Sequence, residues 1–292
     1  GGVAGHAGLF STVEDLAVVK RVIVENVAPT GTAVLNAADP MVSKMAASCP
    51  GSVTFFALDP THPIMATHRA QGHRIVYQDG DAIVAAQGTF EKRLKLSGIP
   101  LTRSGAIGFQ VENVMASVGA AWALNLDWEQ ITGALASFIS DSGTAPGRFN
   151  LFDYKGATLI ADYGHNPDAI QALIKAVDSL PAKRRSVVIS GAGDRRDVDI
   201  TRQTELLGDA FDEVVLYQDQ CQRGREDGEV IALLRQGLEG AKRTKDVKEI
   251  NGEFVAIDTA LATLQPGDLC LILIDQVEEA LAHIDQRVKE SA

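Results

Sequence analysis

Three side chains that can bind a phosphate or carry a proton stand close together after a β-branched segment. "GATLI" (156–160) is followed by Asp162, His165 and Asn166, and the residues after these have helical spacing. A strand that ends where a helix begins presents the free N–H groups and the positive dipole end of that helix. The segment therefore predicts an anion site. The alternative is a turn in which Asn166 opens the helix and Asp162 is a capping acid.

A second charged segment ends the next expected strand in the same manner. "ISGAGDRRD" (189–197) has glycines that allow close backbone approach, followed by Asp194, Arg195 and Arg196. Guanidinium groups bind carboxylates and phosphates in a bidentate manner, so this loop is a candidate substrate site. The alternative is a solvated charged loop. The dinucleotide pattern GxGxxG is not met, because Arg196 stands where the pattern needs glycine.

Three other residues carry charge or a titratable ring in places that are less informative by themselves. Arg148, in "PGRFN", stands near an expected domain boundary, where an arginine holds a ligand or forms a surface ion pair. Lys20 lies on an apolar helical segment, from which most lysines extend their amine to solvent. His6, in "AGHAGLF", lies in an irregular stretch. Local pattern leaves the roles of all three open.

The elements that must position the two charged segments alternate regularly along the second half of the chain. We expect strands near 157–162, 185–190, 213–217, 253–257 and 268–274, and helices near 167–179, 200–210, 227–238, 257–264 and 276–289. Such alternation predicts an α/β fold with a parallel sheet and helices on both faces. Ligands of these folds bind at the carboxyl ends of the strands, which is where both charged segments are expected.

The first half of the chain shows a different order of elements. Residues 12–28 predict a helix, and 109–124 and 127–139 predict two more. Between them we expect strands in "TAVLNAADP", "SVTFFAL", "HRIVYQDGDAIVAAQG" and "EKRLKLSGIP", with a hairpin at Asp79-Gly80. The cluster of Ser, Gly and Pro in "SDSGTAPGRFN" (140–150) is typical of a boundary. We therefore expect domains at 1–146 and 147–292.

The composition excludes several classes of protein. With 292 residues, 46% of them hydrophobic and 22% charged, the chain is long enough for two globular domains. No apolar run approaches the roughly 20 residues that a membrane span needs. Cys49, Cys221 and Cys270 form no CxxC pair, which indicates neither a disulfide framework nor a zinc site and fits a reducing cytoplasm. The net charge of -11 argues against a general nucleic-acid binder.

Three nucleophile or phosphate motifs are missing from the sequence. Neither Gly-x-Ser-x-Gly nor Ser-x-x-Lys occurs, so a serine hydrolase has no nucleophile here. The phosphate loop GxxxxGK[ST] is missing too. A phosphate site must therefore be built in another way or completed from elsewhere.

Several motifs together, in their order, resemble the Mur ligase family of ATP-dependent amide ligases, and most closely its cyanophycin synthetase branch. The resemblance extends from about residue 16 to the end of the chain. The segments that carry it are "VVKRVIVENVAPTGTAVLNAADP" (18–40), "FFALDPTHP" (55–63), "HRAQG" (68–72), "FQVENVMASVGAAWAL" (109–124), "GRFNLF" (147–152), "DYGHNPDAI" (162–170), "GAGDRRD" (191–197), "RGREDGE" (223–229) and "PGDLCLILIDQVEEAL" (266–281).

This resemblance implies part of a Mur-type central ATPase domain over 1–146, then a Rossmann-like C-terminal domain with a mostly parallel sheet over 147–292. In this family the ATP site lies between the two domains. Asn113 matches the asparagine that meets the adenine, and Arg148 and Asp162 match groups near the ribose. His165 and Asn166 match the segment beside the triphosphate, with His165 in a catalytic role.

The resemblance also implies sites for a metal and for the incoming amino acid. Lys20 matches a catalytic lysine that is often carbamylated, and a carbamate offers the oxygen ligands that Mg²⁺ prefers. His6 is the candidate for a metal-proximal histidine of the family, although the spacing to the helix is shorter. Asp194, Arg195 and Arg196 match the loop near the amino-acid substrate.

The implied reaction joins arginine to the side-chain carboxylates of a poly-aspartate backbone (cyanophycin) through an acyl phosphate, with ATP and Mg²⁺. The resemblance implies a cytoplasmic homo-oligomer without nucleic-acid or membrane partners. Since the phosphate loop is missing, we expect this chain to be a fragment that is inactive alone. Ala38 also departs from the family, which commonly has aspartate there. The alternatives are another Mur-type ligase, acting on cell-wall peptides or folylpolyglutamate, and a catalytically silent scaffold.

Overall fold

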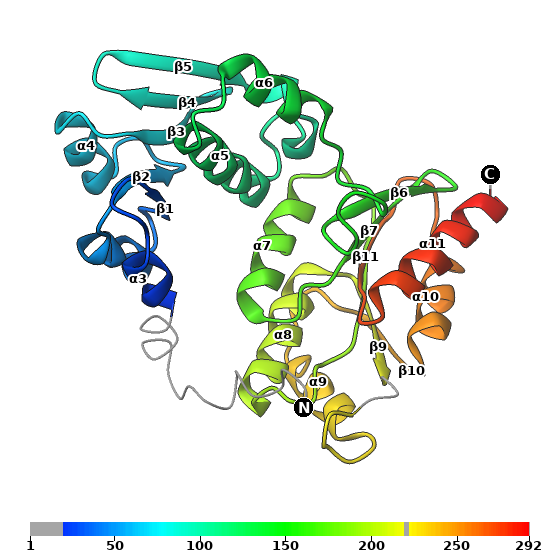
Figure 1. Cartoon of the computed structure of the whole chain (residues 1–292). Coiled ribbons are helices and arrows are strands. Elements are labelled where there is room, and N and C mark those ends of the chain that lie inside the picture. Colours follow the sequence, from blue (N-terminus) through cyan, green and yellow to red (C-terminus); the bar gives the residue numbers. More distant parts are fainter. Residues whose placement is uncertain (1–19, 219–221, 292) are drawn as a thin grey trace. The chain divides into compact units, whose positions relative to one another are not determined.

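The computed structural model describes residues 20–218 and 222–291. It divides into two compact units, Gly1–Phe138 (unit 1) and Ile139–Ala292 (unit 2). Each unit has a β-sheet of its own, and the two sheets share no strand (Figure 1). Among the described helices, none combines the length and the apolar character needed to cross a membrane.

The sheet of unit 1 has five strands in sequence order. The first three are parallel, and the last two continue as antiparallel hairpins. The expected turn at Asp79-Gly80 is confirmed, since it joins β3 to β4. The strands are β1 Thr32–Asn36, β2 Ser52–Ala57, β3 Ile75–Asp79, β4 Ala82–Gln87 and β5 Phe90–Lys95.

Helices cover both faces of this sheet because alternate side chains of its strands are apolar. Val76 packs on one face with α5 and α6, and Ile75 and Tyr77 pack on the other with α3 and α4. Residues 20–25 are also helical, within the helix expected over 12–28. The helices are α3 Pro40–Lys44, α4 Pro63–Ala70, α5 Gly108–Ala123 and α6 Trp128–Ser137, with 3-10 turns at Met45–Ser48, Leu96–Gly98 and Pro100–Thr102.

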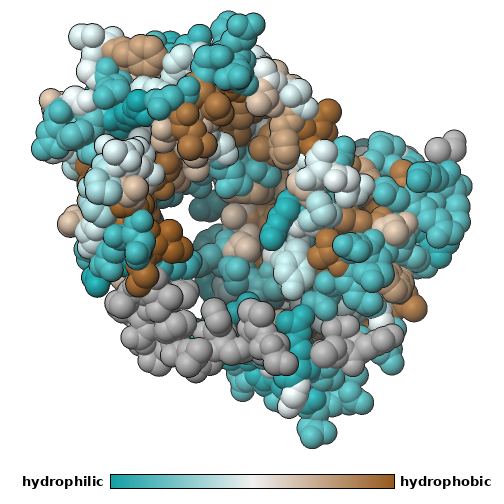
Figure 2. All heavy atoms as spheres, in the orientation of Figure 1, coloured by the Kyte–Doolittle hydropathy of each residue, from teal (hydrophilic) through white to brown (hydrophobic). Residues whose placement is uncertain are grey.

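The end of unit 1 near α5 and α6 exposes apolar side chains. The rings of Phe90, Trp122 and Trp128 lie with centroids 5.6 to 5.9 Å apart. Leu124 and Leu126, in the connection between the two helices, are exposed. Figure 2 shows apolar surface, in brown, gathered over this part of the unit.

The sheet of unit 2 has six strands in the order β10-β9-β8-β11-β7-β6. All neighbours are parallel except β6 and β7, as expected for a mostly parallel sheet. β11 lies between β7 and β8 and pairs with both, although it is the last of the six along the chain. The strands are β6 Asn150–Tyr154, β7 Ala157–Asp162, β8 Arg185–Ile189, β9 Glu213–Gln218, β10 Asp246–Asn251 and β11 Leu269–Leu273.

The helices of unit 2 form a layer on each face of its sheet (Figure 1). α7, α8 and α9 pack side by side on one face. α10 and α11 pack on the other, against a core that includes Leu159, Val188 and Ile272. The helices are α7 Pro167–Asp178, α8 Asp197–Ala210, α9 Glu229–Gly237, α10 Glu253–Leu261 and α11 Val277–Ser291.

The prediction of a strand over residues 253–257 of unit 2 is wrong. Residues 253–257 begin α10, and the strand lies before them at Asp246–Asn251. β10 is an edge strand whose side chains are mostly exposed, so its sequence "DVKEIN" lacks an apolar run. "EFVAI" is apolar because Ala256 and Ile257 are the face of α10 that packs on the sheet.

Candidate functional site

Charged and titratable side chains from four loops meet at the carboxyl edge of the unit 2 sheet. The Asp275 carboxylate, just after β11, lies 3.6 Å from Nε2 of His165, which follows β7. The same carboxylate accepts a hydrogen bond of 3.0 Å from Arg223, in the loop after β9. Arg223 also lies 3.5 Å from the Asp194 carboxylate, in the loop after β8. The two segments singled out from the sequence thus belong to one connected set of charges.

The His165 ring is held firmly at this edge. Its side chain is only 8% exposed. The Tyr163 ring meets it edge-on at 4.4 Å between centroids, and the His165 carbonyl accepts a hydrogen bond from Gln203 of α8 at 3.5 Å. Burial and the Tyr163 ring limit how the His165 ring can turn, and the Gln203 hydrogen bond fixes the backbone that carries it.

Asp162 is buried beside this set, at the end of β7. One carboxylate oxygen accepts a 2.8 Å hydrogen bond from the backbone N–H of Phe149. Burial raises the pKa of Asp162 to about 6, although the N–H of Phe149 and the charge of Arg148 lower it. A carboxylate with a strongly raised pKa at a strand end is a candidate functional group. Arg148 itself is exposed and contributes through its charge.

The raised pKa of Asp162 predicts a specific pH dependence of stability. Because the folded protein holds this proton more tightly than the unfolded chain, the stabilisation is complete below about pH 4. It is lost as the pH rises through about 6, where folded Asp162 ionises. We expect the free energy of unfolding of wild type, relative to Asp162→Asn, to fall by about 2.4 kcal/mol between pH 4 and 7. Urea unfolding of both proteins across this range measures it, and a constant difference would contradict the prediction.

Asn166 performs a structural task at the same edge. Its side-chain oxygen accepts a 2.8 Å hydrogen bond from the backbone N–H of Ala169, and Pro167 follows as the first residue of α7. Asn166 is therefore the N-cap of α7, and Asp162 is not, which corrects one part of the turn alternative. The remaining free N–H groups of this helix end are compatible with an anion.

The loop over 191–197 is held in place by Arg225. This guanidinium donates hydrogen bonds of 2.7 Å to the carbonyls of Gly193 and Arg195, and one of 2.8 Å to Asp197. A Cβ atom on Gly193 would lie 2.1 Å from the carbonyl oxygen of Gln222, so only glycine fits where the two loops touch. The loop therefore has a fixed conformation at the carboxyl edge of the sheet.

The charged residues of that loop differ in what they contact. Asp194 faces Arg223. Arg196 binds the Asp199 carboxylate in a bidentate manner, at 2.8 and 3.0 Å, and is exposed. Arg195 is also exposed. The bidentate arginine predicted from sequence therefore meets a carboxylate of its own helix.

The other predicted site residues belong to unit 1 or lie outside the described residues. Lys20 is exposed at the start of the helical residues 20–25. Asn113 is exposed on α5, where its amide donates a 3.1 Å hydrogen bond to Gln110. His6 lies outside the described residues. Within the described ranges, no group of three or more His, Cys, Asp or Glu side chains is arranged to hold a metal ion.

Sequence reasoning missed Tyr163, Arg223, Arg225 and Asp275. Two signals were present: "RGREDGE" follows β9, and Asp275 stands two residues after the apolar strand β11. Arg223 also has a left-handed backbone, with φ of 50°. Such a conformation is unfavourable for arginine and is often found at functional sites.

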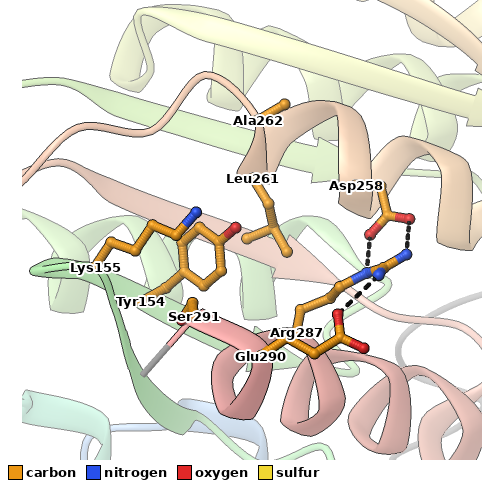
Figure 3. A pocket seen from close by; sticks show the side chains of 8 residues that line it. All are labelled: Tyr154, Lys155, Asp258, Leu261, Ala262, Arg287, Glu290 and Ser291. Atoms are coloured by element: carbon orange, nitrogen blue, oxygen red, sulfur yellow. Dashed lines mark hydrogen bonds and ion pairs between the residues drawn. The ribbon is translucent and has the colours of Figure 1, made fainter.

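A cavity of about 420 Å³ lies at the opposite, amino edge of the sheet (Figure 3). The Arg287 guanidinium reaches both oxygens of Asp258, at 2.8 and 2.7 Å, and also contacts Glu290 at 3.0 Å. Lys155 lies over the Tyr154 ring at 5.0 Å. None of the residues that line this cavity is a site residue predicted from the sequence, so it is a weaker candidate than the carboxyl edge.

Comparisons with known proteins agree on one family. Residues 4–121 match the Mur ligase middle domain, and residues 147–273 match the glutamate ligase domain of Mur ligases. The chain is 33% identical to the cyanophycin synthetase of Geminocystis herdmanii over 285 residues. This match covers 96% of the chain and 32% of that relative. The chain thus spans about a third of the length of the curated relatives it matches.

Solved structures share the fold. FolC of E. coli, in complex with DHPP and ADP, has a TM-score of 0.67 at 17% identity, over 98% of this chain and 59% of that one. The bifunctional folylpolyglutamate synthase/dihydrofolate synthase of Yersinia pestis, complexed with AMPPNP and Mn ion, has a TM-score of 0.64 at 16% identity. That match covers 94% of this chain and 58% of the other.

Proposed function

Because the chain belongs to the Mur ligase superfamily, we propose that its residues serve an ATP-dependent amide ligase. The proposed reaction joins arginine, through its α-amine, to side-chain carboxylates of a poly-aspartate backbone. The similarity to cyanophycin synthetases over nearly the whole chain supports this substrate pair. In this proposal residues 1–146 are part of the central domain and residues 147–292 form the C-terminal domain.

The chemistry proceeds in two steps. The carboxylate attacks the γ-phosphorus of ATP, which gives an acyl phosphate and releases ADP. The arginine amine then attacks the acyl carbon, loses a proton and expels phosphate, so that an amide bond forms. Both steps depend on holding negative charges close together, and positioned cations and N–H groups do this work.

The observation that carries the proposal is the set of charges at the carboxyl edge of unit 2. His165 and the N-terminus of α7 can face phosphate oxygens, and Asp162 and Arg148 can face the ribose. Asp194 is a carboxylate suited to a cationic amino acid, with Arg195 and Arg196 beside it. These roles are our assignments.

Three further roles complete the proposal. Asn113 binds adenine, and its exposed amide on α5 is compatible with that role. Asn166, besides capping α7, lies beside the triphosphate. Lys20 and His6 would serve Mg²⁺, the lysine only as a carbamate, since an amine is no ligand for a hard cation. The steps assigned above to this chain's residues do not pass through the ion.

Substrate feeding tests the proposal. With protein expressed from the complete coding sequence, we expect ADP release to require both an aspartate polymer and arginine. ADP release that depends on a nucleotide-sugar peptide or a folate would replace our substrates with those of another Mur-type ligase. Since the 292 residues lack a GxxxxGK[ST] loop, we expect them to release no ADP when expressed alone.

A catalytically silent scaffold is the second candidate function. The exposed apolar end of unit 1 favours it, because such surfaces often lie in interfaces. Retention of the connected charges of unit 2 favours the ligase, since a scaffold has no need of a buried Asp162. The free thiols of Cys49 and Cys270 support placing the reaction in a reducing compartment such as the cytoplasm.

A further inference from the structure

Glu253, at the start of α10, is a buried acid with no part in the roles assigned above. It is 3% exposed. One carboxylate oxygen accepts a 2.8 Å hydrogen bond from the backbone N–H of Asp275, and the other accepts one of 3.1 Å from the N–H of Gln276. The Gln276 side chain adds a third, at 3.3 Å. The two carboxylate oxygens thus accept hydrogen bonds from two successive residues of the turn between β11 and α11.

This arrangement fixes the place where Asp275 leaves the sheet. Asp275 is the residue that faces both His165 and Arg223, so its position decides whether these two side chains share one carboxylate. A buried carboxylate that accepts two backbone N–H groups is among the stronger hydrogen-bonding arrangements in a protein. Burial raises the pKa of Glu253, whereas the backbone N–H groups of Asp275 and Gln276 lower it and the N-terminal end of α10 favours the negative charge.

We propose that Glu253 is a positioning residue of the ligase site, which acts by holding Asp275 between His165 and Arg223. This rests on the function proposed above only in so far as it concerns catalysis. The hydrogen bonds themselves belong to unit 2 and can be tested without any substrate. Glu253 touches none of the groups assigned to substrate.

The variant Glu253→Gln keeps the shape of the side chain but replaces one of its two hydrogen-bond acceptors with a donor. An amide has one oxygen and one NH₂ group, so one of the two backbone N–H groups would face another donor. A buried donor without an acceptor is costly, and the turn must shift to relieve it. Small displacements of positioned groups lower rates strongly, so we expect kcat to fall by about 10- to 100-fold. KM for ATP should change less than twofold.

Non-additivity distinguishes positioning from a general structural role. If Glu253 acts through Asp275, then the double variant Glu253→Gln/Asp275→Asn should be no slower than Asp275→Asn alone. Multiplicative losses in the double variant would overturn the proposal. The matched control is Glu279→Gln, an exposed glutamate in the first turn of α11, which should leave kcat unchanged.

Amide hydrogen exchange gives a readout that needs no activity. In Glu253→Gln the N–H groups of Asp275 and Gln276 should exchange at least about 10-fold faster than in wild type, while those of β8 should not change. Unchanged exchange at both residues would refute the holding role whatever the enzyme does. If wild type released no ADP with arginine and an aspartate polymer, only the proposed function would fail, and the exchange result would still decide the role of Glu253.

Discussion

Arginine-dependent ADP release should fall at least about 100-fold when alanine replaces His165 in the protein expressed from its complete coding sequence. The His165 ring is nearly buried, lies edge-on to Tyr163 and shares the Asp275 carboxylate with Arg223. In the proposed function this ring faces phosphate oxygens, and the variant removes it from the carboxyl edge. The loss should therefore be in kcat rather than in the amount of folded protein.

His283→Ala is the matched control for this variant. His283 also belongs to unit 2 and also faces a carboxylate, since its Nε2 lies 2.9 Å from Asp258. That pair is on α10 and α11, away from the carboxyl edge. We expect the activity of the His283→Ala variant to stay within twofold of wild type. Unchanged arginine incorporation by the His165 variant would favour the silent scaffold over the ligase.

Gly237→Ala should destabilise unit 2 by about 3 kcal/mol. Gly237 ends α9 where that helix packs against α8. A Cβ atom there would lie 2.2 Å from both the carbonyl oxygen of Thr201 and the hydroxyl oxygen of Thr204. Neither can retreat easily, because one is helix backbone and the other is fully buried. The helices must separate, and the contacts between them weaken.

Gly133→Ala is the corresponding control in unit 1. Gly133 is exposed in α6, and a Cβ atom there would meet nothing within 4 Å. Alanine in an exposed helix interior should raise stability by up to about 1 kcal/mol. The two tryptophans, Trp122 and Trp128, lie in unit 1, so their fluorescence during urea unfolding follows that unit. The Gly237 variant should shift the circular dichroism transition and leave the tryptophan transition in place. A shift of the tryptophan transition alone would contradict this.

Much of the fold follows from the sequence because apolar spacing is strong wherever an element is buried on both sides. β7, β9 and β11 were predicted within one residue at each end, since each is a short run of β-branched and aliphatic residues between helices. β10 was missed because an exposed edge strand is under no pressure to be apolar. The first turn of α10 took its place in the prediction, because a buried helix face resembles a strand over five residues.

The candidate site was predictable to a lesser degree, for a physical reason. Ligands of such folds bind at the carboxyl ends of the strands, and this rule locates Asp162, His165 and the loop after β8. It depends only on the order of elements. It cannot tell which side chains of neighbouring loops turn toward them. Arg223 reaches Asp275 through a left-handed backbone, and Glu253 acts from the start of a helix that the sequence placed four residues later. Such contacts depend on tertiary geometry that no local pattern encodes.

The placement of β11 has a consequence for the order in which the molecule is made. β7 carries Asp162 and leads to His165, whereas β8 leads to the loop over 191–197, and the two strands meet only through β11. A nascent chain that has produced β7 to β10 holds both halves of the edge, but β7 and β8 cannot yet be joined in one sheet. Pairings over such sequence distances form slowly. We therefore expect the candidate site to form late in folding, when β11 pairs with both β7 and β8.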